Sequence, residues 1–360
     1  MCLRRLSVIM STYNNGGLLP VAIESIREQT HSDFEFIIIN DASNDDSGQL
    51  LSDYAALDKR IVLVDNEINV GLAASLNRGL EIAKEAWIAR MDADDIAHPD
   101  RLQKQLAYLQ THPDVDVLSS HMNFTTMDGE FISRWTLPEN HASLMMISIF
   151  ENPAYHPTVV MRTELLRDVG GYNPAYRECQ DAELWLRLAG KAIFACLQEA
   201  VLDYRGSKKS LEEKKLRKQP VVDGFHRDNV SRLAGRAISE QDFAKLRLAY
   251  VPQAGCNLSN ADVLAAIELL HDVMEGMKAQ GILMPHDLDE AQSLMVEYIS
   301  NLLWHSKTFR DASEEIGGDL MSPGQLARFY WRHNSMPKAL RALGFGITSP
   351  REALRYLWGK

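Results

Sequence analysis

The hydrophobic residues in the first half of the chain follow two alternating patterns. Short runs of consecutive apolar residues predict buried strands, and apolar positions three or four residues apart predict helices with one buried face. Strands are expected at residues 6–10, 34–39, 61–64 and 87–90, and helices between them at residues 18–29, 50–57 and 72–80. Strands that alternate with helices in this way predict an α/β fold with a mainly parallel sheet, covered by helices on both faces.

Polar turns directly follow three of the predicted strands, at residues 11–15, 41–46 and 92–95. In an open parallel sheet the carboxyl ends of the strands lie at one edge, and ligands bind in front of that edge. We therefore expect the three turns to converge and to form a binding site.

The pattern changes at residues 205–218, a charge-rich stretch that precedes Pro220. Beyond it the strand patterns fade and helical patterns dominate, as at residues 261–278 and 288–305. We predict an α/β domain over residues 1–205, a charged linker over residues 206–220, and a mostly helical C-terminal region over residues 221–360.

Composition places the chain among soluble globular proteins, with 46% hydrophobic and 24% charged residues in a length of 360. The net charge of -11 argues against nucleic-acid binding. The four cysteines show no C-x-x-C spacing, which is typical of a reducing compartment. The apolar run at residues 6–10 is too short for a secretory signal, and no apolar stretch reaches the roughly 18 residues of a membrane span. These features predict a cytoplasmic protein.

Three carboxylates, Asp92, Asp94 and Asp95, lie just after the fourth predicted strand. Such a group is stable at the end of a buried strand mainly when a hard divalent cation or a cluster of donors offsets its charge. An isolated D-x-D sequence is more often a solvated turn, and we expect Asp95 to cap the helix that begins near Pro99. An EF-hand is excluded, because no glycine or glutamate follows at the required spacing.

Four segments together resemble the family 2 glycosyltransferases, which are inverting, nucleotide-sugar-dependent enzymes with the GT-A fold. The four motifs occur in the order and spacing of the family, and the resemblance covers roughly residues 5–205. The segments are residues 7–14 (SVIMSTYN), 39–45 (INDASND), 91–95 (MDADD) and 178–187 (ECQDAELWLR).

The resemblance implies roles for the first two turns. The turn of Ser11, Thr12, Tyr13 and Asn14 would pack the uracil and ribose of a UDP-sugar, with Tyr13 against the base. Asp41 would accept a hydrogen bond from the uracil N3–H, a proton that cytosine lacks. Outside this combination of motifs, the same residues would be ordinary turn residues.

The resemblance also implies a metal site and a phosphate contact. Asp92 and Asp94 would form the D-x-D pair that binds Mn²⁺ or Mg²⁺, with Asp94 as the direct ligand and Asp92 as the partner of ribose or of a metal-bound water. Arg78 would meet phosphate, and His156 would begin a strand and touch sugar or phosphate. The alternatives are an exposed helical arginine and a structural histidine.

Asp181 is the implied general base, which takes the proton of the acceptor hydroxyl as that oxygen attacks the anomeric carbon opposite the leaving group. Asp181 would otherwise cap the helix at residues 182–188, and Glu183 is the competing candidate for the base. The chain departs from the family at Asn40 and at Gln180, where the family usually has acidic residues, but both departures keep the neighbouring aspartate.

Together these features predict a metal-dependent inverting glycosyltransferase that moves a sugar from a UDP-sugar to a glycan or lipid-linked sugar acceptor in bacterial surface polysaccharide synthesis. Two alternatives stay open. A catalytically idle nucleotide-sugar-binding or scaffold subunit would not need the retained Asp94 and Asp181. A sugar-nucleotide pyrophosphorylase needs a basic loop after the first strand, and the chain has no Lys or Arg between Arg5 and Arg27.

Residues 323–360 reverse the acidic balance of the chain, with seven Lys or Arg against one acid, interleaved with aromatic residues. A basic, aromatic segment of this kind predicts contact with an anionic membrane surface, which would place the enzyme at the inner face of the plasma membrane. The alternative is a helical cap that packs its aromatic residues onto the rest of the protein.

Overall fold

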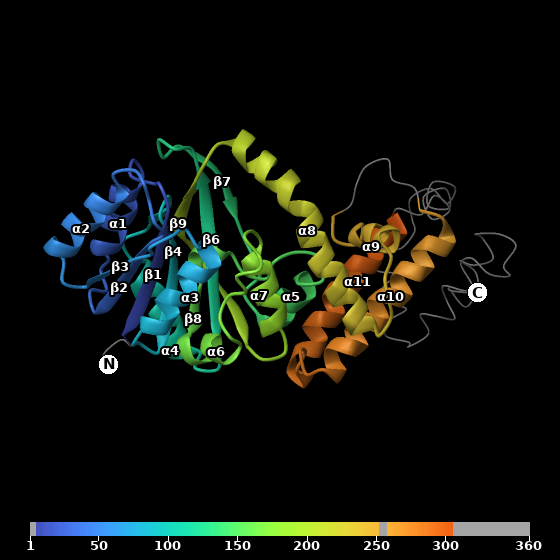
Figure 1. Cartoon of the computed structure of the whole chain (residues 1–360). Coiled ribbons are helices and arrows are strands. Elements are labelled where there is room, and N and C mark those ends of the chain that lie inside the picture. The colour runs from blue at the N-terminus through green and yellow to red at the C-terminus, as the bar shows by residue number, and fades with distance from the viewer. Residues whose placement is uncertain (1–4, 252–257, 305–360) are drawn as a thin grey trace, which may run out of the picture. The chain divides into compact units, whose positions relative to one another are not determined.

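The computed structural model describes residues 5–251 and 258–304 (Figure 1). The chain divides between residues 225 and 226 into two compact units, which are considered one at a time below. The segment at residues 323–360, and with it the predicted membrane contact, lies outside the described residues.

The first unit contains one mixed sheet with the strand order β3-β2-β1-β4-β8-β6-β9-β5, in which β7 pairs with β6. The strands β1 to β4 pair in parallel, and so do β6 and β9. The short strands β8 and β5 run antiparallel to their partners. The bounds are β1 Leu6–Thr12, β2 Phe34–Asn40, β3 Ile61–Asp65, β4 Trp87–Asp92, β5 Ile96–Ala97, β6 Val117–Thr125, β7 Phe131–Trp135, β8 Val160–Arg162 and β9 Phe194–Arg205.

Helices cover both faces of this sheet. Successive side chains of a strand point to opposite faces. Val8 of β1 therefore joins one core cluster with Ile23 and Leu106 from α1 and α4, while its neighbour Ile9 faces α3. A β-carbon at Gly79 of α3 would lie 2.6 Å from Ile9 Cγ2, so glycine here allows α3 to approach β1 closely. The helices are α1 Leu19–Arg27, α2 Ser47–Leu57, α3 Leu72–Ile82, α4 Arg101–Thr111, α5 His141–Ile147, α6 Thr163–Asp168 and α7 Gln180–Leu188.

The predicted α/β fold is confirmed: the four expected strands are β1 to β4, and the mainly parallel sheet has helices on both faces. The strands β1, β2 and β4 are buried along nearly their whole length, which is why they appear in the sequence as nearly continuous apolar runs.

The second unit is helical in its described part, as predicted for the C-terminal region. It contains the end of α8, a long helix whose first part includes most of the segment predicted as a charged linker. The start of α10 is defined by a capping box, in which Ser259 Oγ accepts from the Asp262 N–H and Asp262 Oδ2 accepts from the Ser259 N–H. The bounds are α8 Lys208–Ala234, α9 Glu240–Arg247, α10 Asn260–Ala279 and α11 Leu288–Trp304. No helix in the described part of the chain combines the length and the apolar character that crossing a bilayer requires.

Candidate active site

The polar turns that follow β1, β2 and β4 lie next to one another at one edge of the sheet. In the parallel register, Thr12 is opposite Asn40, and Ser11 is opposite Asp92. The three turns therefore continue from neighbouring strands at the same level. This is the arrangement that parallel pairing imposes, and it brings the implied nucleotide turn and the acidic residues together.

Hydrogen bonds hold the first two turns together. The Asn14 N–H donates to Ser43 Oγ at 3.1 Å, and the Asn44 N–H donates to Asn14 Oδ1 at 2.9 Å. Asn14 has a φ of 53°, a left-handed conformation that asparagine tolerates better than most residues. The ring of Tyr13 in this turn is 46% exposed, so one of its faces is available for stacking.

Asp41 is buried and organises the loop that leads into α3. Its Oδ1 accepts from Asn66 Nδ2 at 2.7 Å and from the Val70 N–H at 2.9 Å, and its Oδ2 accepts from the Gly71 N–H at 2.9 Å. A carboxylate has about four acceptor positions, so Asp41 keeps about one on Oδ2 for a ligand. The side chain that the sequence assigns to base recognition is therefore fixed in place by three donors.

Arg78 of α3 supports the same loop. Its Nη1 donates to the Asp65 carbonyl at 2.9 Å and to Asn66 Oδ1, which in turn orients the amide that holds Asp41. The side chain remains exposed at the surface. In this structure Arg78 positions the loop, and its predicted contact with phosphate stays a prediction.

Asp92, Asp94 and Asp95 form a compact acidic cluster, with carboxylate oxygens that lie within 4.8 Å of one another. Burial, and then the charge of Asp92, raises the pKa of Asp94. Burial and the charges of both neighbours raise the pKa of Asp95 well above its ordinary range. Asp95 Oδ1 accepts from the Arg205 N–H at 3.1 Å, while its buried Oδ2 has no hydrogen-bond partner among the residues that the structure describes.

These observations fit a hard divalent cation. The three carboxylates repel one another, and one of them has a buried oxygen with no hydrogen-bond partner among the described residues. Carboxylate oxygens are the ligands that Mg²⁺ and Mn²⁺ prefer, so a bound cation would offset the repulsion. Asp92 and Asp94 are only partly buried and are therefore the more accessible pair. The prediction that Asp95 caps the following helix is wrong: the N-cap of α4 is Asp100, because residues 96–97 pair with β9 and delay the start of the helix.

Two buried arginines lie beneath the acidic cluster. Arg90 of β4 forms an ion pair with Asp92 through both terminal nitrogens. Burial acts to lower the pKa of Arg90, but the charge of Asp92 and the hydrogen bonds to it, with smaller contributions from Tyr172 and Asp95, together outweigh burial, and the pKa is raised. Arg101 donates to the Arg90 carbonyl at 2.7 Å, and burial together with the charge of Arg90 lowers its pKa to about 9. Sequence reasoning missed both residues, although an arginine inside the apolar run of β4 is itself an unusual signal.

Asp181 lies in the first turn of α7, one residue after the helix begins at Gln180. The N-cap is Cys179, with a φ of 60°, so Asp181 does not cap the helix. The charges of Asp181 and Asp92 both act on Tyr172, whose pKa is raised chiefly by burial. The role of Asp181 as the general base stays a prediction.

Glu183, the competing candidate for the base, is part of a structural ion pair. Arg187 donates to both of its carboxylate oxygens, at 2.6 and 2.8 Å. Arg187 also donates to the carbonyls of Val169 and Gly171 and so ties α7 to the end of α6. A carboxylate whose two oxygens both accept from an arginine has fewer acceptor positions left for the hydroxyl of an acceptor.

His156 has the contacts of a structural histidine. It lies in a 3₁₀ turn at His156–Thr158, so the prediction that it begins a strand is wrong, because the strand β8 starts only at Val160. Its buried Nε2 is joined to Tyr172 Oη by a hydrogen bond of 2.9 Å. Burial lowers the pKa of His156 well below its usual range, and the charge of Arg90 acts in the same direction.

We expect this buried neutral imidazole to make the protein sensitive to acid. Below pH 6.5 the unfolded chain binds a proton at His156 that the folded state does not, so stability present above pH 6.5 is lost as the pH falls. The loss is at most about 1.4 kcal/mol per pH unit. Urea unfolding between pH 7.5 and 5 should give a shallower pH dependence for His156→Gln than for wild type. The exposed His112→Gln is the control, and equal slopes for all three proteins would contradict the assignment.

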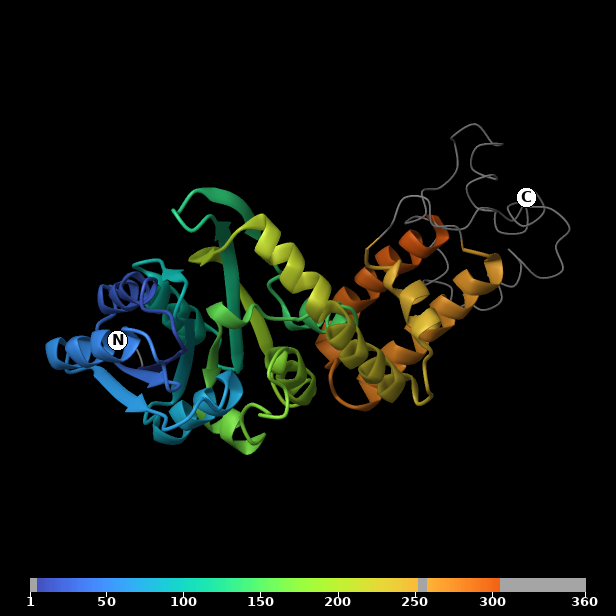
Figure 2. The same cartoon turned by 45° about the horizontal axis from the view of Figure 1, so that its top comes forward.

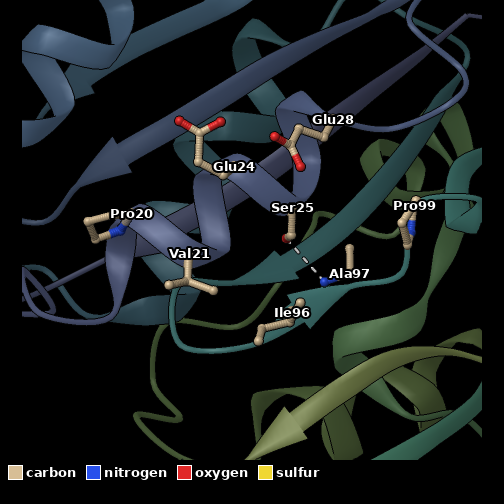
Figure 3. A pocket seen from close by; sticks show the side chains of 8 residues that line it. All are labelled: Pro20, Val21, Glu24, Ser25, Glu28, Ile96, Ala97 and Pro99. Carbon is tan, nitrogen blue, oxygen red and sulfur yellow. Dashed lines mark hydrogen bonds between the residues drawn. The ribbon is translucent and has the colours of Figure 1, made fainter. Parts of the chain in front are cut away.

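A surface pocket of about 410 Å³ lies between α1 and the short strand β5 (Figure 3). Ser25 Oγ accepts from the Ala97 N–H across it at 3.1 Å. Two glutamates and no basic side chain line the pocket, which makes it unsuited to a diphosphate. The lining residues are Pro20, Val21, Glu24, Ser25, Glu28, Ile96, Ala97 and Pro99, and none is a predicted site residue.

Comparisons with known proteins point to one family. The family model described as Glycosyl transferase family 2 matches residues 7–170. An uncharacterized glycosyltransferase of Methanocaldococcus jannaschii is 34% identical over 224 residues, which cover 61% of this chain and 77% of the relative. The O-antigen biosynthesis glycosyltransferase WbnJ of Escherichia coli is 33% identical over 59% of this chain and 83% of its own length. The crystal structure of S. aureus TarS 1-349 in complex with UDP is similar in fold, with a TM-score of 0.50 and 16% identity over 92% of each chain.

Proposed function

Because the chain belongs to glycosyl transferase family 2 and has a GT-A-like fold, we propose that it moves a sugar from a UDP-sugar to a glycan or lipid-linked sugar acceptor, with inversion and with a bound Mn²⁺ or Mg²⁺. The observation that carries the proposal is the convergence at one sheet edge of the Tyr13 turn, Asp41 and the acidic cluster. A nucleotide needs a stacking ring and a base acceptor, and its diphosphate needs a cation. This edge offers the ring of Tyr13, the acceptor Asp41 and the carboxylates that would hold the cation.

The donor is held by residues that are already fixed in place. Tyr13 stacks on the base, and the remaining acceptor position of Asp41 Oδ2 receives the uracil N3–H. Asp92 and Asp94 hold the divalent cation, which when bound supplies positive charge for the diphosphate. Arg90 keeps the Asp92 carboxylate oriented through its ion pair.

The acceptor hydroxyl is activated by Asp181. Its carboxylate takes the hydroxyl proton while the hydroxyl oxygen forms a bond to the anomeric carbon of the donor sugar. The bond from that carbon to the diphosphate oxygen breaks on the opposite face, and the electron pair leaves with UDP. Attack opposite the leaving group inverts the anomeric configuration, through a transition state with oxocarbenium character.

Two comparisons support the nucleotide and the setting. The similar structure of TarS was determined in complex with UDP, and the Escherichia coli relative is named for O-antigen biosynthesis. We therefore propose uridine as the base and synthesis of a bacterial surface polysaccharide as the setting. A catalytically idle nucleotide-sugar-binding subunit remains the second candidate, and it would not hydrolyse a UDP-sugar even slowly in the absence of an acceptor.

Calorimetric titration of UDP, with and without Mn²⁺, tests the proposal. We expect binding that Mn²⁺ strengthens by about tenfold or more, which corresponds to about 1.4 kcal/mol. Titrations with dTDP, GDP and CDP are the controls for the base. If UDP does not bind under either condition, the assignment of the nucleotide is wrong.

A further inference from the structure

Aromatic side chains gather beside the acidic cluster, and the donor site uses none of them. The rings of Trp135 and Tyr204 are stacked, with centroids 5.9 Å apart and planes inclined by 28°. The ring centroid of Tyr155 lies 6.0 Å from that of Trp135, and Phe124 contacts both Trp135 and Tyr204, with centroid distances of 5.8 and 6.1 Å. Phe124 is buried, whereas Trp135, Tyr155 and Tyr204 are only partly buried. We call these three side chains the aromatic shelf.

The aromatic shelf begins directly at the acidic cluster. Tyr204 is the neighbour of Arg205, whose N–H donates to Asp95 Oδ1 and whose Nε donates to the Asp94 carbonyl at 2.6 Å. Burial raises the pKa of Tyr204, and the charges of all three cluster aspartates add to the effect. The phenol therefore lies within electrostatic reach of the carboxylates that would hold the metal.

Lys214 of α8 lies at the edge of the aromatic shelf, and Lys218 follows it one helical turn later. The helix starts beside β7 (Figures 1 and 2), and Lys214 Nζ lies 5.9 Å from the centroid of the Tyr204 ring. The charge of Lys214 acts on Asp94, and the charge of Lys218, one turn later, acts on Cys179 at the start of α7. One face of α8 thus extends from the acidic cluster towards the turn that carries Asp181.

Neither lysine is paired. Among the residues that the structure describes, no carboxylate lies within ion-pair distance of the ammonium group of Lys214 or Lys218. Their neighbours on the same helix do have partners, because Lys209 pairs with Glu213 and Arg217 pairs with Glu178. Two unpaired cations beside a candidate active site, in a chain of net charge -11, match an anionic ligand.

We propose that the aromatic shelf and the two lysines form the acceptor subsite, which receives a saccharide that carries an anionic group, either a carboxylate or a phosphate. The subsite rests on the proposed function, since it places the acceptor between the donor and Asp181. The C–H groups on the apolar face of a pyranose carry slight positive charge and pack on the negative face of an aromatic ring. The anionic group would lie against Lys214 and Lys218, which fixes the orientation of the sugar.

Saturation-transfer NMR on the full chain, in the presence of UDP and Mn²⁺, tests this subsite with three defined probes. They are methyl β-glucuronide, which carries a carboxylate, glucose 6-phosphate, and the neutral methyl β-glucoside. We expect wild type to bind an anionic probe more strongly than the neutral one, and the stronger of the two anionic probes identifies the source of the charge. Wild type that binds UDP but none of the three sugars would overturn the subsite and leave the proposed function intact.

Variants separate the two parts of the subsite. Trp135→Ala should lower the affinity for all three probes by about fivefold or more, while Trp135→Phe should retain part of that affinity. Both variants should bind UDP as wild type does. The double variant Lys214→Gln/Lys218→Gln should weaken only the anionic probes, by about fivefold or more, and Lys209→Gln is the matched control on the same helix. Unchanged sugar binding in Trp135→Ala would overturn the proposal. Weaker UDP binding in the lysine variant would also overturn it, because the two lysines would then belong to the donor site.

Discussion

Asp181→Asn is expected to lower the rate of sugar transfer by roughly 10²- to 10⁴-fold, the usual range for the loss of a general base. Asparagine has almost the same size as aspartate, so the packing at the start of α7 is kept and only the basicity is lost. The residue lies in the first turn of α7, and none of the proposed contacts to the nucleotide or the metal involves it, so UDP binding should stay at the wild-type level. Transfer rates measured at saturating UDP-sugar, together with calorimetric titration of UDP, check both halves of the expectation.

Glu183→Gln is the matched control, because it makes the same change two residues later on the same helix. Glu183 is engaged by Arg187, and its loss should reduce stability by on the order of 1 kcal/mol while leaving most of the activity. If Asp181→Asn were as active as wild type and Glu183→Gln were inactive but folded, the base would have to be reassigned to Glu183. Thermal unfolding of both variants separates a catalytic loss from a folding loss.

The part of the fold that could be predicted is the part whose strands are mostly apolar. β1, β2 and β4 are buried on both faces and appear as continuous runs in the sequence. The strand β6 gave no such signal, because its buried positions include Ser119 and His121. Those polar groups are satisfied by distant partners: Ser119 Oγ bonds with Thr158 Oγ1, and His121 Nε2 with the Leu137 carbonyl. Polar residues that are satisfied only by tertiary contacts hide a buried strand from any analysis of hydrophobic pattern.

The candidate site also has a part that the sequence indicated and a part that it did not. The acidic cluster is contiguous in the chain, so its composition alone indicated a metal. The three donors to Asp41 come from residues 66–71, and the partner of Asp92 is an arginine inside β4. Such contacts depend on strand register and loop path, which the sequence does not specify locally. The aromatic shelf is the extreme case, because its members come from β7, β9 and the segment just before the 3₁₀ turn at His156–Thr158.

Asp94→Ala is expected to remove the part of UDP binding that depends on Mn²⁺, with a loss of about 100-fold in affinity, or about 2.7 kcal/mol. Asp94 belongs to the accessible pair of the acidic cluster, and Asp95 cannot replace it readily, because one of its oxygens accepts from the Arg205 N–H and the residue is buried. Titration of UDP at several Mn²⁺ concentrations measures the effect. The metal-independent binding should be nearly unchanged, since the Tyr13 turn and Asp41 do not depend on Asp94.

A loss of binding in this variant would not come from unfolding. In the metal-free protein, burial and the charge of Asp92 raise the pKa of Asp94, which means that its ionised form destabilises the folded state near neutral pH. Replacing it with alanine removes that repulsion, so the variant should unfold at the same temperature as metal-free wild type or higher. Asp100→Ala is the control, because Asp100 is a nearby acid that pairs with Lys104 and lies outside the acidic cluster. If Asp94→Ala kept the full effect of Mn²⁺ on UDP binding, the metal would have to lie elsewhere, and the acidic cluster would be a structural feature of the turn after β4.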